Sequence, residues 1–314
     1  MINNPLVSVV VITYNSSRTV LDTLDSIANQ TYQNIELIVS DDCSKDDTIQ
    51  VVKTWMEKHS SRFRRMELLT VEKNTGLVKN CNRGRNAAKG AWIKGIAGDD
   101  MLMPDAIMEY MNYVLANPQC QMCVAGVVVF STENIPTEQL SLGYNQYLIK
   151  ADISLEKQQR QIVKKMIFPG PTYFYSKDLY KSVGGYDEKY ILSEEWAFCY
   201  KVLNKGNRIN VIHKPLVKYR LTSSSVCRDP KARYGNPIWV LDNRSFFLDV
   251  RLKEMLKRGM FLSAFMQSLD YTKRYVFIKK GDTMPIKAVI FLCDMLNPAT
   301  YYILFKRILC KWIR

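Results

Sequence analysis

The sequence predicts an α/β protein with a doubly wound, mainly parallel sheet, and two observations lead to this class. Apolar, β-branched runs alternate with segments whose apolar residues recur at helical spacing, and four such pairs fit within about the first hundred residues. Two of the runs end in adjacent acidic residues, Asp41-Asp42 and Asp99-Asp100. Parallel sheets bind their ligands at such strand ends, so the same pattern predicts where the site lies.

The first half of the chain is expected to contain four strands and the helices that connect them. The strands are predicted at Val7–Thr13, 35–40, 68–72 and 91–97. Each is a nearly continuous apolar run, as expected of strands buried on both faces. One helix is expected to begin at Val20, and a second to follow the capping-box spacing of Ser44 and Asp47. A third helix is expected over 77–89.

The pattern changes in the second half, where charged helices separate shorter strands. After a helix over 105–115 we expect strands at Met122–Phe130, 173–175 and 208–220, and helices over 152–166, 177–183 and 193–203. The stretch 131–151 is polar and poorly periodic, so no element is predicted there. From about residue 228 the sequence becomes helical and basic. We therefore expect one domain over 1–228, in halves 1–103 and 104–228, and an appended helical region over 229–314.

The positive charge is concentrated at the C-terminal end of the chain. The whole sequence has 44 Lys and Arg against 30 Asp and Glu, a net charge of +14, and residues 230–314 contribute 16 basic and 6 acidic residues to it. On a helical wheel, the basic residues of 299–314 share one arc and apolar residues with Trp312 fill the opposite one. This predicts a helix on an anionic membrane surface, with packing on its own domain or a partner chain as the alternative. Without a recognition motif, nucleic acid ranks last among the possible partners.

The compartment is predicted from the N-terminus, the apolar runs and the cysteines. The first apolar run leads into Thr13 and Tyr14 rather than a cleavage site, so we expect a strand and no signal peptide. No run reaches the ~18–20 apolar residues of a membrane-spanning helix. The eight Cys are scattered and are expected to be reduced in the cytoplasm. Cys120 and Cys123 have C-x-x-C spacing, but a lone pair favours a structural role over zinc.

Adjacent carboxylates at a strand end repel each other unless a cation lies between them. Mg²⁺ or Mn²⁺ suits such hard oxygen ligands, and Gly98 before Asp99-Asp100 allows the backbone to approach a ligand closely. Acid-rich surface turns remain the alternative for either pair. Glu194 and Glu195 form a third pair in the first turn of a predicted helix, where acids also simply favour the helix dipole.

Several short segments, in their order and spacing, resemble the inverting glycosyltransferases of family 2, which have a GT-A fold, and specifically their bacterial surface-polysaccharide members. The resemblance covers roughly residues 5–225, through segments 7–15, 35–48, 74–76, 82–84, 88–90, 98–100, 184–187 and 193–196. It implies a nucleotide-sugar half over 1–103 and an acceptor half over 104–228.

The resemblance also implies roles for individual residues. On the donor side, Tyr14 lies beside the nucleotide base, Asp42 hydrogen-bonds it, and Asp99 lies near the ribose and the sugar. Asp100 binds Mn²⁺ or Mg²⁺ on the diphosphate. Glu195 is the catalytic base, and the candidates on the acceptor side are Trp196 and Tyr173. Lys79, Arg83 or Arg85 could supply charge toward the diphosphate, or could be solvated helix positions.

The resemblance therefore implies a metal-dependent inverting hexosyl or hexosaminyl transfer from a nucleotide-diphosphate sugar, with a UDP-sugar as the expected donor. The acceptor is a saccharide or a lipid-linked saccharide in surface polysaccharide synthesis, such as lipopolysaccharide or capsule, at the cytoplasmic face of the plasma membrane. The chemistry is consistent with this, because a cation neutralises the leaving diphosphate, a carboxylate deprotonates the acceptor and the sugar passes through an oxocarbenium-like state.

Four positions depart from the family pattern: Glu195 stands for Asp, Cys43 for Gly, Cys81 for Arg and Thr222 for His. These changes keep a non-catalytic, nucleotide-sugar-binding subunit of an assembly complex open as an alternative. A sugar nucleotidyltransferase is the other alternative, although the sequence of residues 13–17 does not fit the Gly-rich loop of such enzymes.

Overall fold

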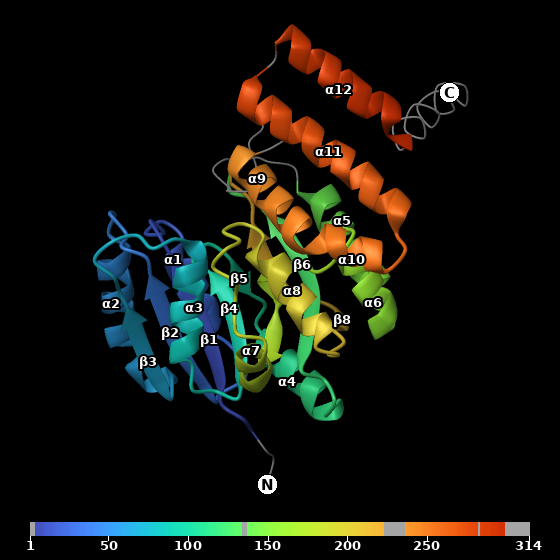
Figure 1. Ribbon diagram of the computed structural model, residues 1–314. Helices are drawn as coiled ribbons and strands as arrows, with labels where there is room; N and C mark the ends of the chain where they lie inside the picture. The colour runs from blue at the N-terminus through green and yellow to red at the C-terminus, as the bar shows by residue number, and fades with distance from the viewer. Residues whose placement is uncertain (1–3, 134–136, 223–235, 282, 299–314) are drawn as a thin grey trace. The chain divides into compact units, whose positions relative to one another are not determined.

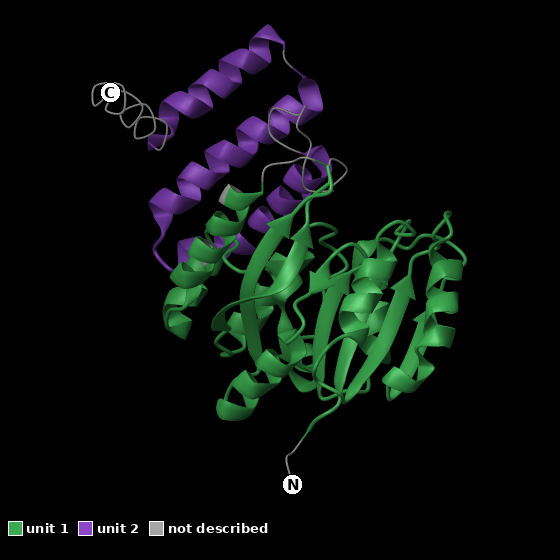
Figure 2. Cartoon of the chain, turned by 180° about the vertical axis from the view of Figure 1, so that it is seen from behind, with its two compact units in different colours: residues 1–223 green, residues 224–314 purple. Residues whose placement is uncertain are grey.

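The computed structural model describes residues 4–133, 137–222, 236–281 and 283–298 (Figure 1). By its internal contacts the chain divides into two compact units, Met1–Ser223 and Ser224–Arg314 (Figure 2). The predicted helix over 299–314 lies outside the described residues, as does most of the linker between the units.

The first unit is built on one eight-stranded sheet with the order β3-β2-β1-β4-β7-β6-β8-β5. Its strands are β1 Val7–Thr13, β2 Ile35–Asp41, β3 Arg65–Leu69, β4 Trp92–Ala97, β5 Met101–Leu102, β6 Met122–Phe130, β7 Phe174–Ser176 and β8 Asn210–Arg220. Strands β3, β2, β1 and β4 are parallel neighbours, and β6 and β8 are parallel as well. Strand β7 runs antiparallel to both β4 and β6, and β5 runs antiparallel to β8. The predicted α/β class with a mainly parallel sheet is confirmed.

Helices connect these strands and pack along the sheet (Figure 1). They are α1 Val20–Ala28, α2 Thr48–Lys58, α3 Leu77–Ala87, α4 Ala106–Ala116, α5 Glu138–Ala151, α6 Leu155–Ile162, α7 Lys177–Ser182 and α8 Glu194–Asn204, with 3₁₀ turns η1 Ser60–Arg62 and η2 Gly170–Thr172. Because layers cover both faces, all seven residues of β2 are buried. The Glu36 carboxylate in that strand is compensated by the Ser8 hydroxyl at 2.5 Å and by Arg65 at 2.9 Å.

Three local predictions are wrong, each for a physical reason. Strand β3 is Arg65–Leu69 rather than 68–72, because its register on β2 places Leu68 beside Val39. Helix α2 begins at Thr48, and Asp46 accepts the Thr48 N–H, whereas Ser44 bonds to Asp41 instead of capping.

The third wrong prediction is the polar stretch 131–151, which contains helix α5. This helix contacts β6 through polar side chains that bond to the strand's backbone. Asn145 accepts from the Val127 N–H and donates to its carbonyl, both at 3.1 Å, and Ser141 accepts from the Val129 N–H at 2.8 Å. Because an amide and a hydroxyl side chain bind α5 to β6, the helix has little of the apolar periodicity by which a helix is predicted from sequence.

The second unit consists of helices in its described part: α9 Pro237–Phe246, a π-helical turn η3 Phe247–Arg251, α10 Leu252–Lys257, α11 Phe261–Lys280 and α12 Met284–Leu296. The predicted helical appendage is confirmed. Arg251 is buried there and donates to the Tyr271 hydroxyl at 2.9 Å and to Gln267 at 2.5 Å. Within the described ranges, no helix is both long enough and apolar enough to cross a bilayer.

Candidate functional site

The predicted site lies where the strand order reverses. From β1 the chain continues to β2 on one side, while β4 pairs with β1 on the other, so the ends of β1 and β4 border a topological switch point. The loop after β4 is held by its neighbours, because the Gly98 N–H bonds to Ile12 O at 2.9 Å and the Gly98 carbonyl accepts from Thr19 at 2.7 Å. A Cβ on Gly98 would lie 2.8 Å from a methyl carbon of Thr13.

Asp99 and Asp100 follow this glycine, and Asp100 is almost fully buried. Its Oδ1 accepts the Arg220 N–H at 2.8 Å, and the Arg220 guanidinium donates to Asp99 O at 2.7 Å and pairs with Asp22 at 2.6 Å. Burial, and then the neighbouring Asp99 charge, raise the pKa of Asp100 well above its usual range, and burial also raises the pKa of Asp99. Two desolvated carboxylates that repel each other form a place that a cation would stabilise.

The donor set fits a divalent cation that shares its coordination with a substrate. In the described part of the chain, no group of three or more His, Cys, Asp or Glu residues could hold a metal. Among those residues, Asp99 and Asp100 are the carboxylates of this site that could bind such a cation. Mg²⁺ is often held in this way, by one or two carboxylates together with substrate phosphate oxygens and water. Arg220 was not among the predicted site residues, although it ends a long predicted strand two residues before Thr222.

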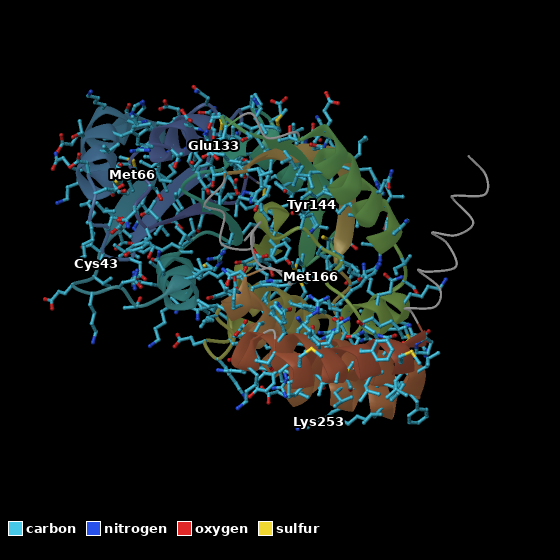
Figure 3. The ribbon with its side chains drawn as sticks, turned by 90° about the horizontal axis from the view of Figure 1, so that it is seen from above. Cys43, Met66, Glu133, Tyr144, Met166 and Lys253 are labelled. Atoms are coloured by element: carbon cyan, nitrogen blue, oxygen red, sulfur yellow. The ribbon has the colours of Figure 1, made fainter. Side chains whose placement is uncertain are left out.

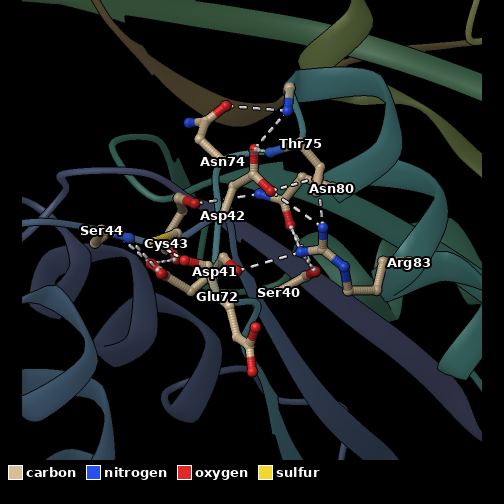
Figure 4. Close-up of polar contacts among 12 residues, drawn as sticks. Ser40, Asp41, Asp42, Cys43, Ser44, Glu72, Asn74, Thr75, Asn80 and Arg83 are labelled. Atoms are coloured by element: carbon tan, nitrogen blue, oxygen red, sulfur yellow. Dashed lines mark hydrogen bonds and ion pairs between the residues drawn. The ribbon is translucent and has the colours of Figure 1, made fainter.

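The other acidic pair has a different environment (Figure 4). The Asp42 carboxylate accepts hydrogen bonds from the hydroxyl and N–H of Thr75, at 2.6 and 2.9 Å, from the Gly76 N–H at 2.7 Å and from Arg83 at 3.1 Å. Burial acts to raise the pKa of Asp42, but these bonds outweigh it and the pKa is lowered. Asp41 is likewise satisfied, by Thr13 and by Ser44. In this structure Asp42 thus holds the 74–76 loop and Arg83 in place.

The remaining donor-side candidates differ in exposure. Tyr14 is about half exposed and stands before Asn15, whose φ of 53° turns the chain away from β1. Lys79 is exposed on α3. Arg83 already bonds to the Asp42 network, and Arg85 is buried, so Lys79 is the exposed member of the three basic candidates.

Glu195 lies in the first turn of α8 and is half-buried. Its carboxylate lies directly over Gly170, where a Cβ would come within 1.8 Å of Oε2. Burial raises the pKa of Glu195 to about 6, against the opposing effect of Arg85 and Lys94. A carboxylate with a pKa of about 6 can accept a proton efficiently near neutral pH.

The aromatic candidates next to Glu195 are anchored rather than free. Tyr173 is 2% exposed, and its hydroxyl accepts from the Cys199 thiol at 3.1 Å. Trp196 is half-buried, and its indole N–H donates to Ile162 O at 2.6 Å. Sequence reasoning did not select Lys94, a fully buried lysine in β4, although a lysine inside an apolar strand was a visible signal.

The comparison with protein families decides which kind of protein has this geometry. The family model described as "Glycosyl transferase family 2" matches residues 8–184, more than half of the chain. The chain belongs to this family. The resemblance predicted from the motifs is therefore confirmed.

Among relatives in the family, the Bacillus subtilis (strain 168) protein named "Putative glycosyltransferase EpsE" is 31% identical over 130 residues, which are 41% of this chain and 46% of that protein. An "Uncharacterized glycosyltransferase" of Haemophilus influenzae is 26% identical over 230 residues, 70% of this chain and 67% of that one. The match thus spans less than half the length of the Bacillus relative.

Solved structures of glycosyltransferases share the fold of this family member. S. aureus TarS 1-349 in complex with UDP-GlcNAc superposes with a TM-score of 0.62 at 18% identity, covering 92% of this chain and 79% of that one. The mannosyltransferase PcManGT from Pyrobaculum calidifontis, in complex with GDP-Man and Mn²⁺, has a TM-score of 0.57 at 16% identity, over 94% and 81%. At such identities the likeness shows the fold alone, and the predicted GT-A fold is confirmed.

Proposed function

We propose that this family 2 chain is a metal-dependent inverting glycosyltransferase. It transfers a hexosyl or hexosaminyl group from a nucleotide-diphosphate sugar, with a UDP-sugar as the expected donor. The acceptor is a saccharide or lipid-linked saccharide of a surface polysaccharide such as lipopolysaccharide or capsule. The observation that carries the proposal is that a desolvated, mutually repelling Asp99-Asp100 pair and a half-buried Glu195 with a raised pKa both lie near β4.

On the donor side, Asp100 together with Asp99 would hold Mn²⁺ or Mg²⁺, which when bound neutralises charge on the leaving diphosphate. Tyr14 would lie beside the base, the loop held by Asp42 would form the base pocket, and Lys79 would face the diphosphate. The complexes of TarS with UDP-GlcNAc and of PcManGT with GDP-Man and Mn²⁺ support this assignment by analogy of fold.

On the acceptor side, Glu195 takes the proton of the acceptor hydroxyl. The hydroxyl oxygen forms a bond to the anomeric carbon while the bond from that carbon to the diphosphate oxygen breaks, and the electron pair leaves with the diphosphate. A single displacement inverts the anomeric centre, so that an α-linked donor yields a β-linkage. Trp196 would border the acceptor, and Tyr173 would support it from the interior.

The test is nucleotide release by the purified protein with a panel of nucleotide sugars, Mn²⁺ and lipid-linked acceptors. We expect turnover with a UDP-sugar that falls about a hundredfold or more in Glu195→Ala, because general bases contribute roughly 10²–10⁴-fold. Glu156→Ala is a matched control, since Glu156 is an exposed acid in the first turn of α6. Donor binding without turnover on any acceptor would instead favour the non-catalytic subunit, which the departures at Cys81 and Thr222 keep in view.

We further propose that the second unit docks on an anionic membrane surface at the cytoplasmic face. Helix α12 exposes an apolar face, made of Met284, Ala288, Phe291, Leu292, Met295 and Leu296. Exposed lysines near one end of the α11–α12 pair, Lys279, Lys280 and Lys287, add the charge that anionic lipids attract. The basic, apolar segment 299–314 follows directly in the sequence.

Vesicle flotation tests this docking, with phosphatidylcholine vesicles that contain or lack phosphatidylglycerol. We expect binding to the anionic vesicles, weakened severalfold by Leu292→Glu. Leu142→Glu on α5 is the control, since it makes the same change of charge at a similarly exposed leucine of the first unit. Equal loss in both variants would contradict docking through α12, and concentration-dependent dimerisation lost in Leu292→Glu would assign the face to a second copy.

A further inference from the structure

Two buried cations, Lys94 and Arg85, lie near Glu195. Lys94 is fully buried in β4, and Arg85 on α3 is 7% exposed. Among the described residues, neither belongs to an ion pair. A buried cation in that state is unfavourable unless polar atoms compensate it. The atoms that do so fix both cations beside Glu195.

Lys94 joins β4 to the turn that lies under Glu195. Its ammonium donates to the carbonyl oxygens of Gly95 and Pro171, both at 2.6 Å. Pro171 belongs to η2, and the Tyr110 hydroxyl holds the same turn by donating to Thr172 O at 2.8 Å. The position of the turn therefore depends on a buried charge in the neighbouring strand.

Arg85 is fixed against the same strand. Its guanidinium donates to the Tyr175 hydroxyl at 2.7 Å and to Cys81 O at 3.1 Å, and it stacks over the Tyr186 ring at 4.6 Å. It also occupies the space beside Gly95, where a Cβ would lie 2.4 Å from one of its terminal nitrogens. The missing side chain of Gly95 thus leaves space for the Arg85 guanidinium, as that of Gly170 does for the Glu195 carboxylate.

Gly170 completes the arrangement. A Cβ at this position would lie 1.8 to 2.0 Å from all three atoms of the Glu195 carboxyl group. We propose that Gly170, Lys94 and Arg85 are positioning residues for Glu195, the glycine leaving the space that the carboxylate fills and the two cations attracting it there. The proposal rests on the proposed role of Glu195 as the base.

The electrostatics around Glu195 support this assignment. The buried carboxyl group of Glu194 precedes Glu195 in the chain. Besides Arg85 and Lys94, Cys81, Cys199, Tyr173 and Tyr186 also interact with Glu195. Burial raises the pKa of all four, to about 11 for Cys81, so they are neutral near pH 7. Burial lowers the pKa of Lys94 to about 7, against the opposing effect of Asp100 and then of Glu195. Arg85 is therefore the lasting positive charge, and Lys94 contributes a share that depends on pH.

Gly170→Ala tests the steric part. The clash involves the far end of a flexible side chain, so we expect a folded protein with an unchanged melting temperature. We expect kcat to fall about ten- to a hundredfold, because misplacement of a reacting group by ~1 Å can cost 10². Donor affinity should stay unchanged. Gly143→Ala on α5 is the control, since its Cβ would meet nothing within 4 Å. Wild-type kcat in Gly170→Ala, with Glu195→Gln inactive, would overturn the proposal.

Arg85→Met and Arg85→Lys test the electrostatic part. Loss of the charge should raise the pKa of Glu195, so that the acidic limb of the pH–rate profile moves to higher pH, and Arg85→Lys should restore most of the shift. If Arg85→Met does not fold, Lys94→Met takes its place, and the titration of Glu195 itself is then the readout, because Lys94 also acts on Asp100. An unmoved limb would overturn this part.

Carbon-13 NMR of labelled glutamate keeps this inference separate from the proposed function. The titration of Glu195 should shift upward in the same variants whether or not the protein turns a donor over. If Glu195→Gln keeps full turnover, the base assignment fails, and a shifted titration would still support the electrostatic arrangement. An unshifted titration would contradict that arrangement whatever the activity.

Discussion

The two Asp-Asp pairs at the ends of strands have the same sequence and similar positions in the sheet, yet the pKa values of Asp42 and Asp100 are shifted in opposite directions. Asp41-Asp42 lies at the end of β2, and Asp99-Asp100 lies just after β4. Asp42 accepts four hydrogen bonds from its own chain, and its pKa is lowered. Asp100 is buried beside a like charge with one backbone N–H on Oδ1, and its pKa is raised well above the usual range.

The difference teaches that an acidic dipeptide at a strand end is not in itself a ligand site. What distinguishes the pairs is the supply of donors. The 74–76 loop and α3 bring N–H, hydroxyl and guanidinium groups to Asp42, whereas the loop after β4 brings the Asp99 carboxylate to Asp100. A carboxylate that accepts hydrogen bonds from its own chain stabilises the fold. A carboxylate that is buried beside a like charge favours the binding of an external cation. The four predictions that follow test this contrast, from the largest expected effect to the smallest.

The largest effect is expected from Asp100→Asn, which removes the charge of the acid proposed to bind the cation. We expect nucleotide release to fall about a hundred- to a thousandfold, the range seen when a group that stabilises transition-state charge is removed. The melting temperature without metal should not fall, because a buried repulsion is removed. Asp178→Asn, at an exposed acid in α7, should change neither quantity. Loss of stability equal to that of an Asp42 variant would contradict the contrast.

The matching change in the other pair is Asp42→Ala, which should act on stability first. Removing the acceptor takes away the four hydrogen bonds that Arg83, Thr75 and Gly76 donate to this carboxylate, so we expect the free energy of unfolding to drop by about 2–3 kcal/mol. Urea denaturation measures it. Asp47→Ala, at the exposed position before α2 without a side-chain cap bond, should cost less than about 0.5 kcal/mol. Equal losses would mean that the four bonds do not stabilise the loop.

The pH dependence of stability sharpens the same contrast. The pKa of Asp42 is lowered on folding, so its contribution is fully present above the unfolded value of ~3.9 and is lost as pH falls through the folded value. The stability difference between wild type and Asp42→Ala should therefore be largest near neutrality and shrink in acid. Denaturation midpoints at a series of pH values measure it, and a difference that stayed constant to the lowest pH would contradict it.

The smallest expected effect is the response to a cation. A ligand that binds only the folded state stabilises it by RT ln(1 + [L]/Kd), and we expect Mn²⁺ to raise the melting temperature by a few degrees. Asp42→Ala should keep most of that increase, and Asp100→Asn should lose it. Thermal denaturation with Mn²⁺ or with EDTA compares the three proteins, and an increase retained in Asp100→Asn would remove Asp100 from the cation site.

Much of the framework could be read from the sequence because it depends on local patterns. β1 and β6 have the predicted bounds, since a buried strand needs an uninterrupted apolar run. The family could be identified from the order of short segments, and the acidic pairs could be placed at strand ends. Helix α5 could not, because Asn145 and Ser141 bind it to β6 through polar bonds that leave no apolar stripe.

By itself, the sequence determined the α/β class, the family and the residues at the strand ends, because these depend on periodicity and on short spacings along the chain. Only the tertiary structure decided which acids are satisfied, because the donors of Asp42 come from another loop and helix, and those of Asp100 from a strand 120 residues away. It also decided that Glu195 lies against Gly170 and within the electrostatic influence of Arg85 and Lys94. Burial and like-charge proximity are properties of distance in space, and they set the pKa values on which the proposed chemistry depends.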